Sequence, residues 1–540
     1  MNETNELAHD VALSMEPAAH FHLELSNRGV ESQAISPSPL LPTQFLEIAK
    51  PGDWGKVASV AKDLAWRWVA GWAEDEGNLF SVSVCLELQG TYLVLRTRTD
   101  SGKPFLPSHA PYFVSANRPE RHMRDMFGIK FTGHPDPRRW TRHQAWDSET
   151  YPLRHAFPKE GQSPGQTPPD KDYPFFKVEG HGVFEIPVGP VHAGIIEPGH
   201  FRFHAVGETL LNLEERLCYV HKGIEKIAEG RTAESLARLA GRVSGDTTVG
   251  HAFAACLAME RAAGLEVPLR ASFIRGFLVE LERVINHLWD MAAICNDVAF
   301  AFAYYQFGRL RELWLRDNQA LFGHRLLMDR IVPGGVNVDV TLESSERITK
   351  SIKFLRQELS ELVTIHDQNS SLEDRLVAAG HLRVEDAKTL GALGFVGRSS
   401  GQSFDVRKDA PYSPYDQLEV TVPVEDQGDV ASRFWVRYKE LWVALKLIEQ
   451  LLEKMPDGEI ATPWVSPPPD AEGLGLVEGW RGEILSYVRF GEDGRISRYY
   501  PRDPSIVNWP ALEKLVLGNI VPDFPVCNKS VNGSYSGNDL

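Results

Sequence analysis

The sequence predicts an α+β protein in two parts, a small α/β module followed by a larger, mainly α-helical domain. Three observations support this prediction. Residues 53–73 carry apolar side chains at helical spacing, and strand-like runs follow at 79–88 and 92–96. Helical spacing dominates residues 210–327. Between the two parts, residues 157–175 are too rich in proline and glycine to pack a core.

These observations divide the chain into four segments. Residues 1–40 are polar and contain prolines toward their end, so we expect a flexible lead-in. The α/β module is expected at residues 41–156, and a linker rich in proline and glycine at 157–176. Residues 177–540 then form the second domain.

Composition narrows the classes of function. The chain has 540 residues, of which 43% are hydrophobic, enough for cores in more than one domain. Its net charge of −16, from 57 basic and 73 acidic residues, argues against a nucleic-acid partner. None of the five cysteines forms a Cys-x-x-Cys pair, which argues against a disulfide framework and against an iron–sulfur cluster or zinc site in this chain.

The sequence shows no pattern typical of a secretory signal or a membrane span. Residues 1–19 lack a basic start and a long apolar core. The most apolar stretch, residues 284–307, is interrupted by Asp290, Asn296 and Asp297, so we expect a buried core helix there. Any association with a membrane is therefore expected to come through partners.

The most informative stretch is residues 242–251, which read R-V-S-G-D-T-T-V-G-H and lie between two segments of helical spacing. Ser, Thr and Asp side chains at such a place accept hydrogen bonds from the free N–H groups of a helix. By itself, the stretch therefore predicts a capped helix start.

The same stretch resembles the first metal-binding motif of the large subunit of nickel–iron hydrogenases, in the energy-converting group that includes formate hydrogenlyase. Arg242, Gly245 and His251 match that motif. Ser244 and Thr247 stand where the family has its two cysteines. The resemblance therefore covers the loop and the following helix but not the metal ligands.

Residues near the C-terminus match the second metal motif of the family in the same incomplete way. Ser534 and Gly537 occupy the positions of its two cysteines, and Asp539 matches a trailing aspartate. Nickel and iron are held by a cage of soft thiolates, which hydroxyl groups and glycine cannot replace. The resemblance therefore implies a chain that binds no metal and no other cofactor of its own.

Residues 120–139, continued by 151–154, resemble the 30-kDa-type subunit of respiratory complex I, which hydrogenlyase large subunits carry fused at their N-terminus. The fusion implies that the basic residues Arg138 and Arg139 dock to a neighbouring subunit. The alternative is an ordinary solvated basic surface.

The motifs G-P-V-H and E-P-G-H-F-R open the second domain. They resemble a β-hairpin shared by hydrogenase large subunits and the 49-kDa-type subunit of complex I. The resemblance implies that Glu197 transfers protons and that His200 lies near a histidine of the quinone pocket. Without it, we would interpret His192, His200 and His204 as turn or surface histidines.

Two further stretches match the family. Residues 280–288 resemble its long central helices, and we expect a core helix with charges toward the solvent. Arg398, followed by Asp405 and Arg407, matches a run found in both hydrogenases and complex I. Binding of an anion and bonding within the fold are both open for Arg398.

The chain matches neither chemistry that the resemblance implies. Hydrogen activation needs the missing thiolates, and quinone reduction in complex I uses a tyrosine where this chain has Gly245. What we expect is a pocket at the former ligand positions Ser244, Thr247, Ser534 and Gly537. Its supporting residues would be Arg242, Gly245, Arg398 and Asp539. Its candidate proton-relay residues are Glu197, His200, Asp246 and His251.

We therefore expect the metal-free large subunit of a membrane-associated, complex I-related oxidoreductase, linking electron transfer to proton movement. The iron–sulfur cluster would belong to a small, complex I 20-kDa-like subunit. Further expected partners are a ferredoxin-like subunit and antiporter-like membrane subunits, at the cytoplasmic face of the inner membrane. Two alternatives stay open: a non-catalytic docking subunit, and a subunit of an NADH:quinone oxidoreductase that binds quinone.

Overall fold

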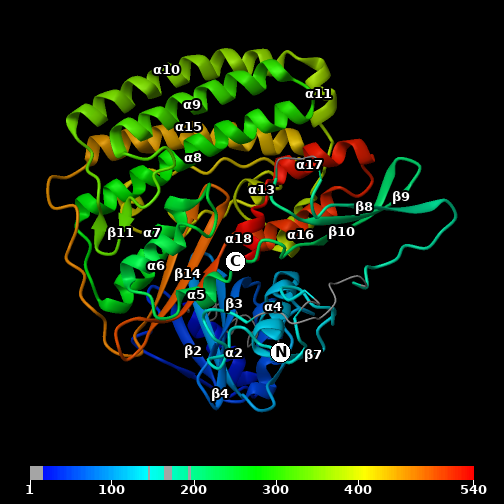
Figure 1. Cartoon of the computed structure of the whole chain (residues 1–540), viewed down its shortest axis with the longest axis vertical. Coiled ribbons are helices and arrows are strands. Elements are labelled where there is room, and N and C mark those ends of the chain that lie inside the picture. The colour runs from blue at the N-terminus through cyan, green and yellow to red at the C-terminus, as the bar shows by residue number, and fades with distance from the viewer. Residues whose placement is uncertain (1–15, 144–145, 163–172, 193–195) are drawn as a thin grey trace, which may run out of the picture. The chain divides into compact units, whose positions relative to one another are not determined.

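The computed structural model describes residues 16–143, 146–162, 173–192 and 196–540 (Figure 1). The chain divides into an N-terminal unit, Met1–Asp172, and a C-terminal unit, Tyr173–Leu540. This division falls inside the segment 157–176 that the sequence predicts as a linker. The α+β fold class is confirmed.

The N-terminal unit is built on one mixed sheet of five strands. Their spatial order is β1 (Ser32–Ala34), β2 (Gln44–Ile48), β5 (Thr91–Asp100), β4 (Leu79–Leu88) and β3 (Arg67–Asp75). Strands β2 and β5 are parallel, and the other neighbours are antiparallel. A small parallel pair joins β6 (Phe105–Pro107) to β7 (Lys130–Thr132).

Three helices complete the core of this unit: α2 (Pro17–Asn27), α3 (Trp54–Asp63) and α4 (Asn117–Phe127). Over residues 16–40, helix α2 corrects the expectation of a flexible lead-in, whereas residues 1–15 lie outside the described part of the chain. Phe21 and Leu25 of α2 are fully buried, and the Phe21 ring packs edge-on against Trp66 at 5.6 Å. Two apolar residues one turn apart are too weak a signal to identify in a polar segment.

The helix expected over residues 53–73 is also shorter than predicted. Helix α3 ends at Asp63, and strand β3 begins at Arg67. Ala65 between them has a φ of +59°, a left-handed conformation that interrupts the helix. Aromatic and β-branched residues in 66–72 favour a strand and are buried on both faces, so their pattern could not separate the two structures.

The C-terminal unit opens with a three-stranded antiparallel sheet. Its strand order is β10 (Thr209–Arg216), β9 (His200–Val206) and β8 (Val183–Val188). The expected hairpin is therefore present as β8 and β9. Strand β10 corrects the prediction that helical structure begins at residue 210.

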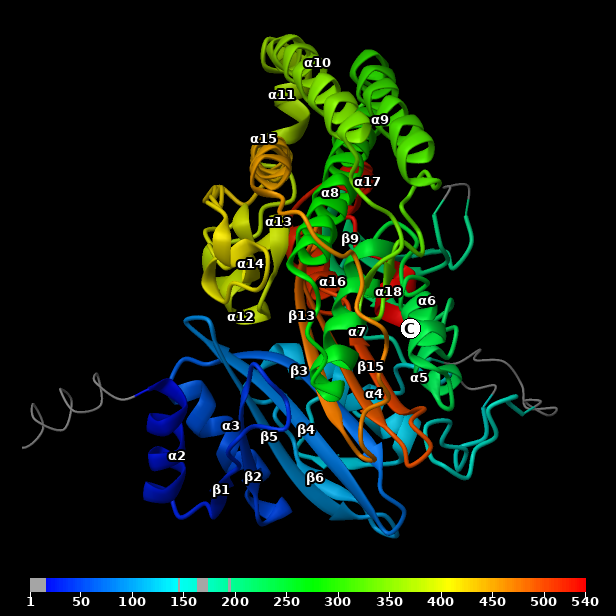
Figure 2. The same cartoon turned by 90° about the vertical axis from the view of Figure 1, so that its left-hand side faces the viewer.

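The helical part of this unit centres on α8 (Leu269–Asp297), which contacts both α9 (Ala301–Phe322) and α15 (Val430–Lys454). Helix α10 (Leu342–Asp367) lies against α9 (Figure 2). The single core helix expected over 284–307 is in fact the end of α8 and the start of α9. The shorter helices are α5 (Ile224–Ala228), α6 (Ala233–Ala240), α7 (Thr248–Ala263), α11 (Ser370–Leu376), α12 (Val384–Leu390), α13 (Gly394–Arg398), α14 (Val406–Asp409), α16 (Ser505–Leu515), α17 (Phe524–Val531) and α18 (Tyr535–Asp539).

A second antiparallel sheet in this unit was not predicted. It is formed by β13 (Glu472–Gly479), β14 (Gly482–Phe490) and β15 (Ile496–Arg502). Helix α7 packs closely on β13. The close approach leaves no room for a side chain at Gly475, where an added Cβ would lie 1.9 Å from the Ala254 carbonyl oxygen. The sheet and helix together hold the loop before α7 and the turn between β13 and β14. A minor two-stranded pair is formed by β11 (Ile331–Val332) and β12 (Gly335–Val336).

The close approach of α7 to β13 predicts the effect of one methyl group. Gly475→Ala should lower the free energy of unfolding by about 2 kcal/mol or more, because the backbone of α7 must move away. Urea denaturation measures this loss. Gly491→Ala is the control, since its added Cβ meets nothing closer than 3.5 Å. Equal stability of the two variants would show that α7 does not depend on this contact.

Candidate functional site

The loop before α7 and the C-terminal segment meet through two serine hydroxyls. Ser244 Oγ lies 2.8 Å from Ser534 Oγ, although the residues are 290 positions apart. Ser534 caps helix α18 by accepting the Gly537 N–H at 2.9 Å, and Ser536 Oγ lies 3.4 Å away. Together with Thr247, these serines form what we call the hydroxyl cluster (Ser244, Thr247, Ser534 and Ser536). Two positions that the sequence predicts as former metal-ligand positions, Ser244 and Ser534, are therefore in contact.

Asp246 ties this loop to the turn between β13 and β14. Its carboxylate accepts hydrogen bonds from the hydroxyl groups of Ser244 at 2.8 Å and Thr247 at 3.0 Å. The guanidinium group of Arg481 donates to both carboxylate oxygens at 2.7 Å. Burial alone would raise the pKa of Asp246, but the charge and hydrogen bonds of Arg481 hold it below its ordinary value. Asp246 is therefore an ionised anchor at neutral pH.

His251, in the first turn of α7, pairs with an acid that the sequence did not single out. Its Nε2 lies 2.8 Å from Oδ2 of Asp503, and both side chains are fully buried. Asp503 also accepts the Ser505 N–H at 2.8 Å. Burial would raise the pKa of Asp503, but the hydrogen bond and charge of His251 lower it to about 2. The pair fixes the ring of His251 next to the C-terminal segment.

Glu197 reaches the hydroxyl cluster from the loop between β8 and β9. Its Oε2 accepts the Ser536 N–H at 2.9 Å. Lys222 joins the same region, since its Nζ donates to the carbonyl oxygens of Val243 and Ser536 at 3.2 and 3.0 Å. Burial lowers the pKa of Lys222, while nearby carboxylates, Glu197 first among them, oppose the shift. An acid and a base therefore lie together beside the cluster.

Comparison with protein families identifies the relatives of this chain. Residues 48–163 match the 30-kDa subunit and residues 297–471 the 49-kDa subunit of respiratory-chain NADH dehydrogenase. Residues 222–292, which include the loop before α7, match nickel-dependent hydrogenase. Formate hydrogenlyase subunit 5 of Escherichia coli (strain K12) is 33% identical over 450 residues, which cover 83% of this chain and 79% of the relative. The chain belongs to this family of hydrogenase and complex I large subunits.

Two other relatives of this large subunit represent different branches of the family. The C/D subunit of the NADH-quinone oxidoreductase of Phocaeicola vulgatus is 32% identical over 417 residues, covering 73% of this chain and 79% of the relative. A chain of the archaeal membrane-bound sulfane sulfur reductase has the same fold, with a TM-score of 0.63 and 26% identity over 66% of this chain and 99% of that one. Among the described residues of this chain, no helix is long and apolar enough to cross a membrane.

The residues of this large subunit do not fit a nickel–iron centre. Three of the four ligand positions carry hydroxyl groups, which are hard donors, and the fourth is Gly537. A Cβ added at Gly537 would lie 2.6 Å from Cγ of Asp503 and 2.8 Å from its Oδ2. The Asp503 carboxylate therefore occupies the space that a cysteine side chain would need. Within the described ranges, no cluster of three or more His, Cys, Asp or Glu side chains could hold a metal ion.

Other residues predicted for the pocket lie apart from the hydroxyl cluster. The His200 ring bonds to the Gly189 carbonyl oxygen at 3.1 Å and accepts Nε of Arg202 at 3.1 Å. Burial lowers the pKa of His200. Arg242 is partly exposed and pairs with Asp329 at 2.7 Å. The two contacts of His200 are local to the sheet of β8 and β9, and that of Arg242 lies at the protein surface.

The remaining predicted residues have structural surroundings. Asp539 Oδ2 accepts the Val220 N–H at 3.1 Å, which holds α18 in place. A Cβ added at Gly245 would meet nothing within 4 Å, so the position of the complex I tyrosine is open. In the N-terminal unit, Arg138 binds Asp136 at 2.7 Å and Arg139 donates to the Trp146 carbonyl oxygen at 3.3 Å. Their role in docking stays a prediction.

The expectation for residues 280–288 was wrong. Glu280, Glu282, Arg283 and His287 are at most 2% exposed, so the charges of α8 face the interior. Each has a partner inside the fold: Glu282, for example, accepts the N–H groups of Val249 and Gly250 at 2.7 and 3.1 Å. Arg398 likewise binds buried carboxylates and not the hydroxyl cluster.

The space between Gly537 and Asp503 gives a direct test. Gly537→Cys should destabilise the protein by about 2 kcal/mol, because its Cβ overlaps a carboxylate that His251 and Ser505 hold in place. Ser534→Cys is the control. This exchange of oxygen for sulfur adds no heavy atom and should cost only about 1 kcal/mol, through loss of the helix cap. Melting temperatures of the two variants measure the difference, and a wild-type value for Gly537→Cys would contradict the geometry.

Proposed function

We propose that this chain is a metal-free large subunit of a membrane-associated, complex I-related oxidoreductase, in which the hydroxyl cluster links electron transfer to proton movement. One observation carries the proposal. Ser244 and Ser534, which the family resemblance assigns to the positions of two thiolate ligands, lie 2.8 Å apart at their hydroxyl oxygens. This contact supports a hydrogenase-like site in which hydroxyl groups take the place of thiolates.

The proposed partners follow from the relatives. Their names describe parts of hydrogenase, formate hydrogenlyase and quinone oxidoreductase complexes. We propose a small, complex I 20-kDa-like subunit whose iron–sulfur cluster lies beside the hydroxyl cluster, together with ferredoxin-like and antiporter-like membrane subunits. The chain itself would be peripheral, on the cytoplasmic side of the membrane.

Proton movement is proposed for Glu197 and Lys222. Glu197 accepts the Ser536 N–H with its carboxylate oxygen Oε2. Lys222 donates from Nζ to the carbonyl oxygen of the same Ser536. The carboxylate can accept a proton and the ammonium can release one next to Ser534 and Ser536. Asp246 is less suited to this role, since Arg481 keeps it ionised.

The first test is metal analysis of the purified complex. Because hydroxyl groups and glycine bind nickel poorly, nickel should be well below one atom per chain by mass spectrometry. A preparation that lacks only this chain serves as the control for metal bound by other subunits. Stoichiometric nickel that appears and disappears with this chain would overturn the proposal.

The second test is Glu197→Gln. The amide oxygen can still accept the Ser536 N–H, so the loop should keep its place, but the residue can no longer exchange a proton. Turnover coupled to proton uptake should fall by about 100-fold in membranes that contain the assembled complex. Glu185→Gln is the control, because Glu185 lies on the exposed strand β8 and pairs with Arg202.

A second candidate function is a docking platform without chemistry. One observation favours it: the polar groups at the site mostly satisfy one another, through the Ser244–Ser534, Asp246–Arg481 and His251–Asp503 contacts. This alternative predicts that Glu197→Gln leaves turnover unchanged while the complex assembles normally. Quinone binding has less support, because no phenol stands at Gly245.

A further inference from the structure

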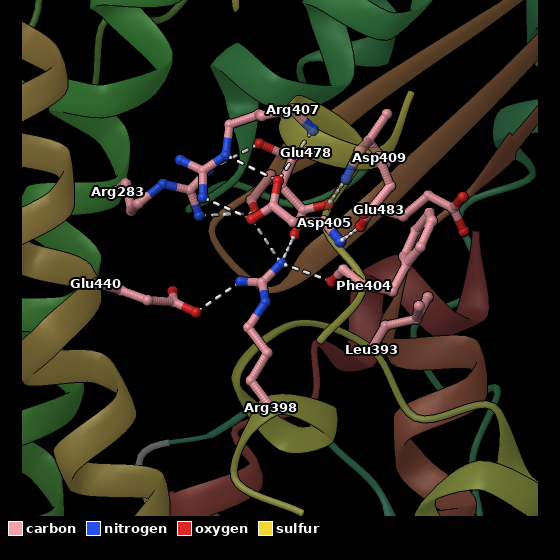
Figure 3. Close-up of polar contacts among 12 residues, drawn as sticks. Arg283, Leu393, Arg398, Phe404, Asp405, Arg407, Asp409, Glu440, Glu478 and Glu483 are labelled. Carbon is pink, nitrogen blue, oxygen red and sulfur yellow. Dashed lines mark hydrogen bonds and ion pairs between the residues drawn. The ribbon is translucent and has the colours of Figure 1, made fainter. Parts of the chain in front are cut away.

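A second group of polar side chains, separate from the hydroxyl cluster, is buried in the C-terminal unit. We call it the Arg398 network (Figure 3). Its charged side chains are each at most 1% exposed. Its members come from α8, α13, α14, α15 and β13, with Asp405 just before α14. They are Glu280, Arg283, Arg398, Asp405, Arg407, Glu440 and Glu478.

Two carboxylates of the network share one nitrogen atom. Nη2 of Arg398 lies 2.9 Å from Oδ2 of Asp405 and also contacts Oε1 of Glu478. Nη1 of the same arginine donates to Glu440 at 2.6 Å. Arg407 binds Asp405 at 2.7 Å and Glu280 at 2.9 Å. The acids therefore outnumber the cations that separate them.

The count of charges shows the imbalance. Three guanidinium groups (Arg283, Arg398 and Arg407) face four carboxyl groups (Glu280, Asp405, Glu440 and Glu478). His287 contacts Glu440 at 2.8 Å, but burial lowers the pKa of this histidine, so it adds no positive charge at neutral pH. An unpaired charge at such depth costs several kcal/mol, and binding a proton removes that cost.

Charged groups around the network do not neutralise its excess negative charge, because they form ion pairs with one another. Arg437 binds Asp290 at 2.9 Å, Arg481 binds Asp246, and Arg502 binds Glu483. Other titratable groups near the network are the phenols of Tyr412 and Tyr415, the carboxyl group of Glu282, whose pKa burial raises to about 8, and the exposed carboxyl group of Asp409, which accepts the Asp405 N–H at 2.8 Å. Burial raises the pKa of both phenols, so they are neutral.

Glu478 is the least compensated of the four acids. Asp405 and Glu280 each form an ion pair with Arg407. Glu280 also forms an ion pair with Arg283 and accepts a hydrogen bond from the Tyr415 hydroxyl. Within the described part of the chain, the Glu478 carboxylate has only its share of Arg398 and one backbone N–H, that of Val406 at 3.2 Å. We propose that the Arg398 network is a proton-binding site in which Glu478 holds one exchangeable proton.

The electrostatics agree with this assignment. Burial first, and then the negative charge of Asp405, raise the pKa of Glu478 to about 7. Burial would also raise the pKa of Asp405, but Arg407 and Arg398 lower it to about 2. A carboxyl group with a pKa near neutrality can both bind and release a proton under physiological conditions.

The site is connected to the hydroxyl cluster by the end of β13 and the turn that follows it. Glu478 is followed two residues later by Trp480, whose Nε1 donates to the Asp246 carbonyl oxygen and to Thr247 Oγ1, both at 3.0 Å. Arg481 comes next and binds the Asp246 carboxylate. A change of charge at Glu478 therefore occurs within three residues of the side chains that position the loop before α7.

Infrared spectroscopy of the full-length chain tests the proposal. A buried protonated carboxyl group has a C=O stretching band apart from those of carboxylates, and wild type minus Glu478→Gln should show this band at pH 6. Asp405→Asn should also lose it although Glu478 is intact, because three cations then face three acids. Glu260→Gln is the control: Glu260 is buried against Arg275 outside the network, and the band should remain.

Stability provides an independent readout. Because Glu478 binds a proton more tightly in the folded than in the unfolded chain, wild type should lose stability as pH rises from about 4.5 to about 7. Glu478→Gln lacks this loss, so its melting temperature relative to wild type should increase over that range. If Glu478→Gln does not fold, the difference between the wild-type and Asp405→Asn spectra decides. A band that is missing from the difference between wild type and Glu478→Gln, or kept in Asp405→Asn, would overturn the proposal.

Discussion

The ion pair between Asp246 and Arg481 is the contact on which the rest of the site depends. Nη1 and Nη2 of Arg481 each lie 2.7 Å from one oxygen of the Asp246 carboxylate. Nε of Arg481 donates to the Asn532 carbonyl oxygen at 2.7 Å. One side chain therefore joins the loop before α7, the β13–β14 turn and the segment that leads to Ser534. With these three segments fixed, the hydroxyl groups of Ser244 and Ser534 come within hydrogen-bond distance.

Much of the architecture could be predicted because it depends on local patterns. Strand β4 and helix α10 follow from period-2 and period-3.6 spacing of apolar residues. The sheet of β13, β14 and β15 was missed because it is buried on both faces and has no alternation to detect. The family resemblance, in contrast, depended on several motifs in a fixed order, and the family comparison confirms it.

The candidate site was predictable only in part. Motif positions identified Ser244 and Ser534, and the structure brings them together. Asp503 and Lys222 were missed because their partners are 252 and 314 residues away in sequence, and neither lies in a motif that marks it. For α8, the sequence showed charges at helical spacing, but spacing alone cannot tell a solvated face from one whose charges are paired in the interior.

The substitution of thiolates by hydroxyl groups has a physical consequence for the whole domain. A thiolate cage without its metal would place negative charge in a buried site, whereas hydroxyl groups donate and accept hydrogen bonds among themselves. Ser244 and Ser534 do so, and Asp503 fills the space beside Gly537 while, against the effect of burial, His251 and Arg481 lower its pKa. These groups therefore find partners within the chain. Within the Arg398 network, the least compensated carboxyl group is that of Glu478, which stands three residues before Arg481 in the chain. In this arrangement, a group that can change its protonation is close in sequence to the arginine that positions the hydroxyl cluster.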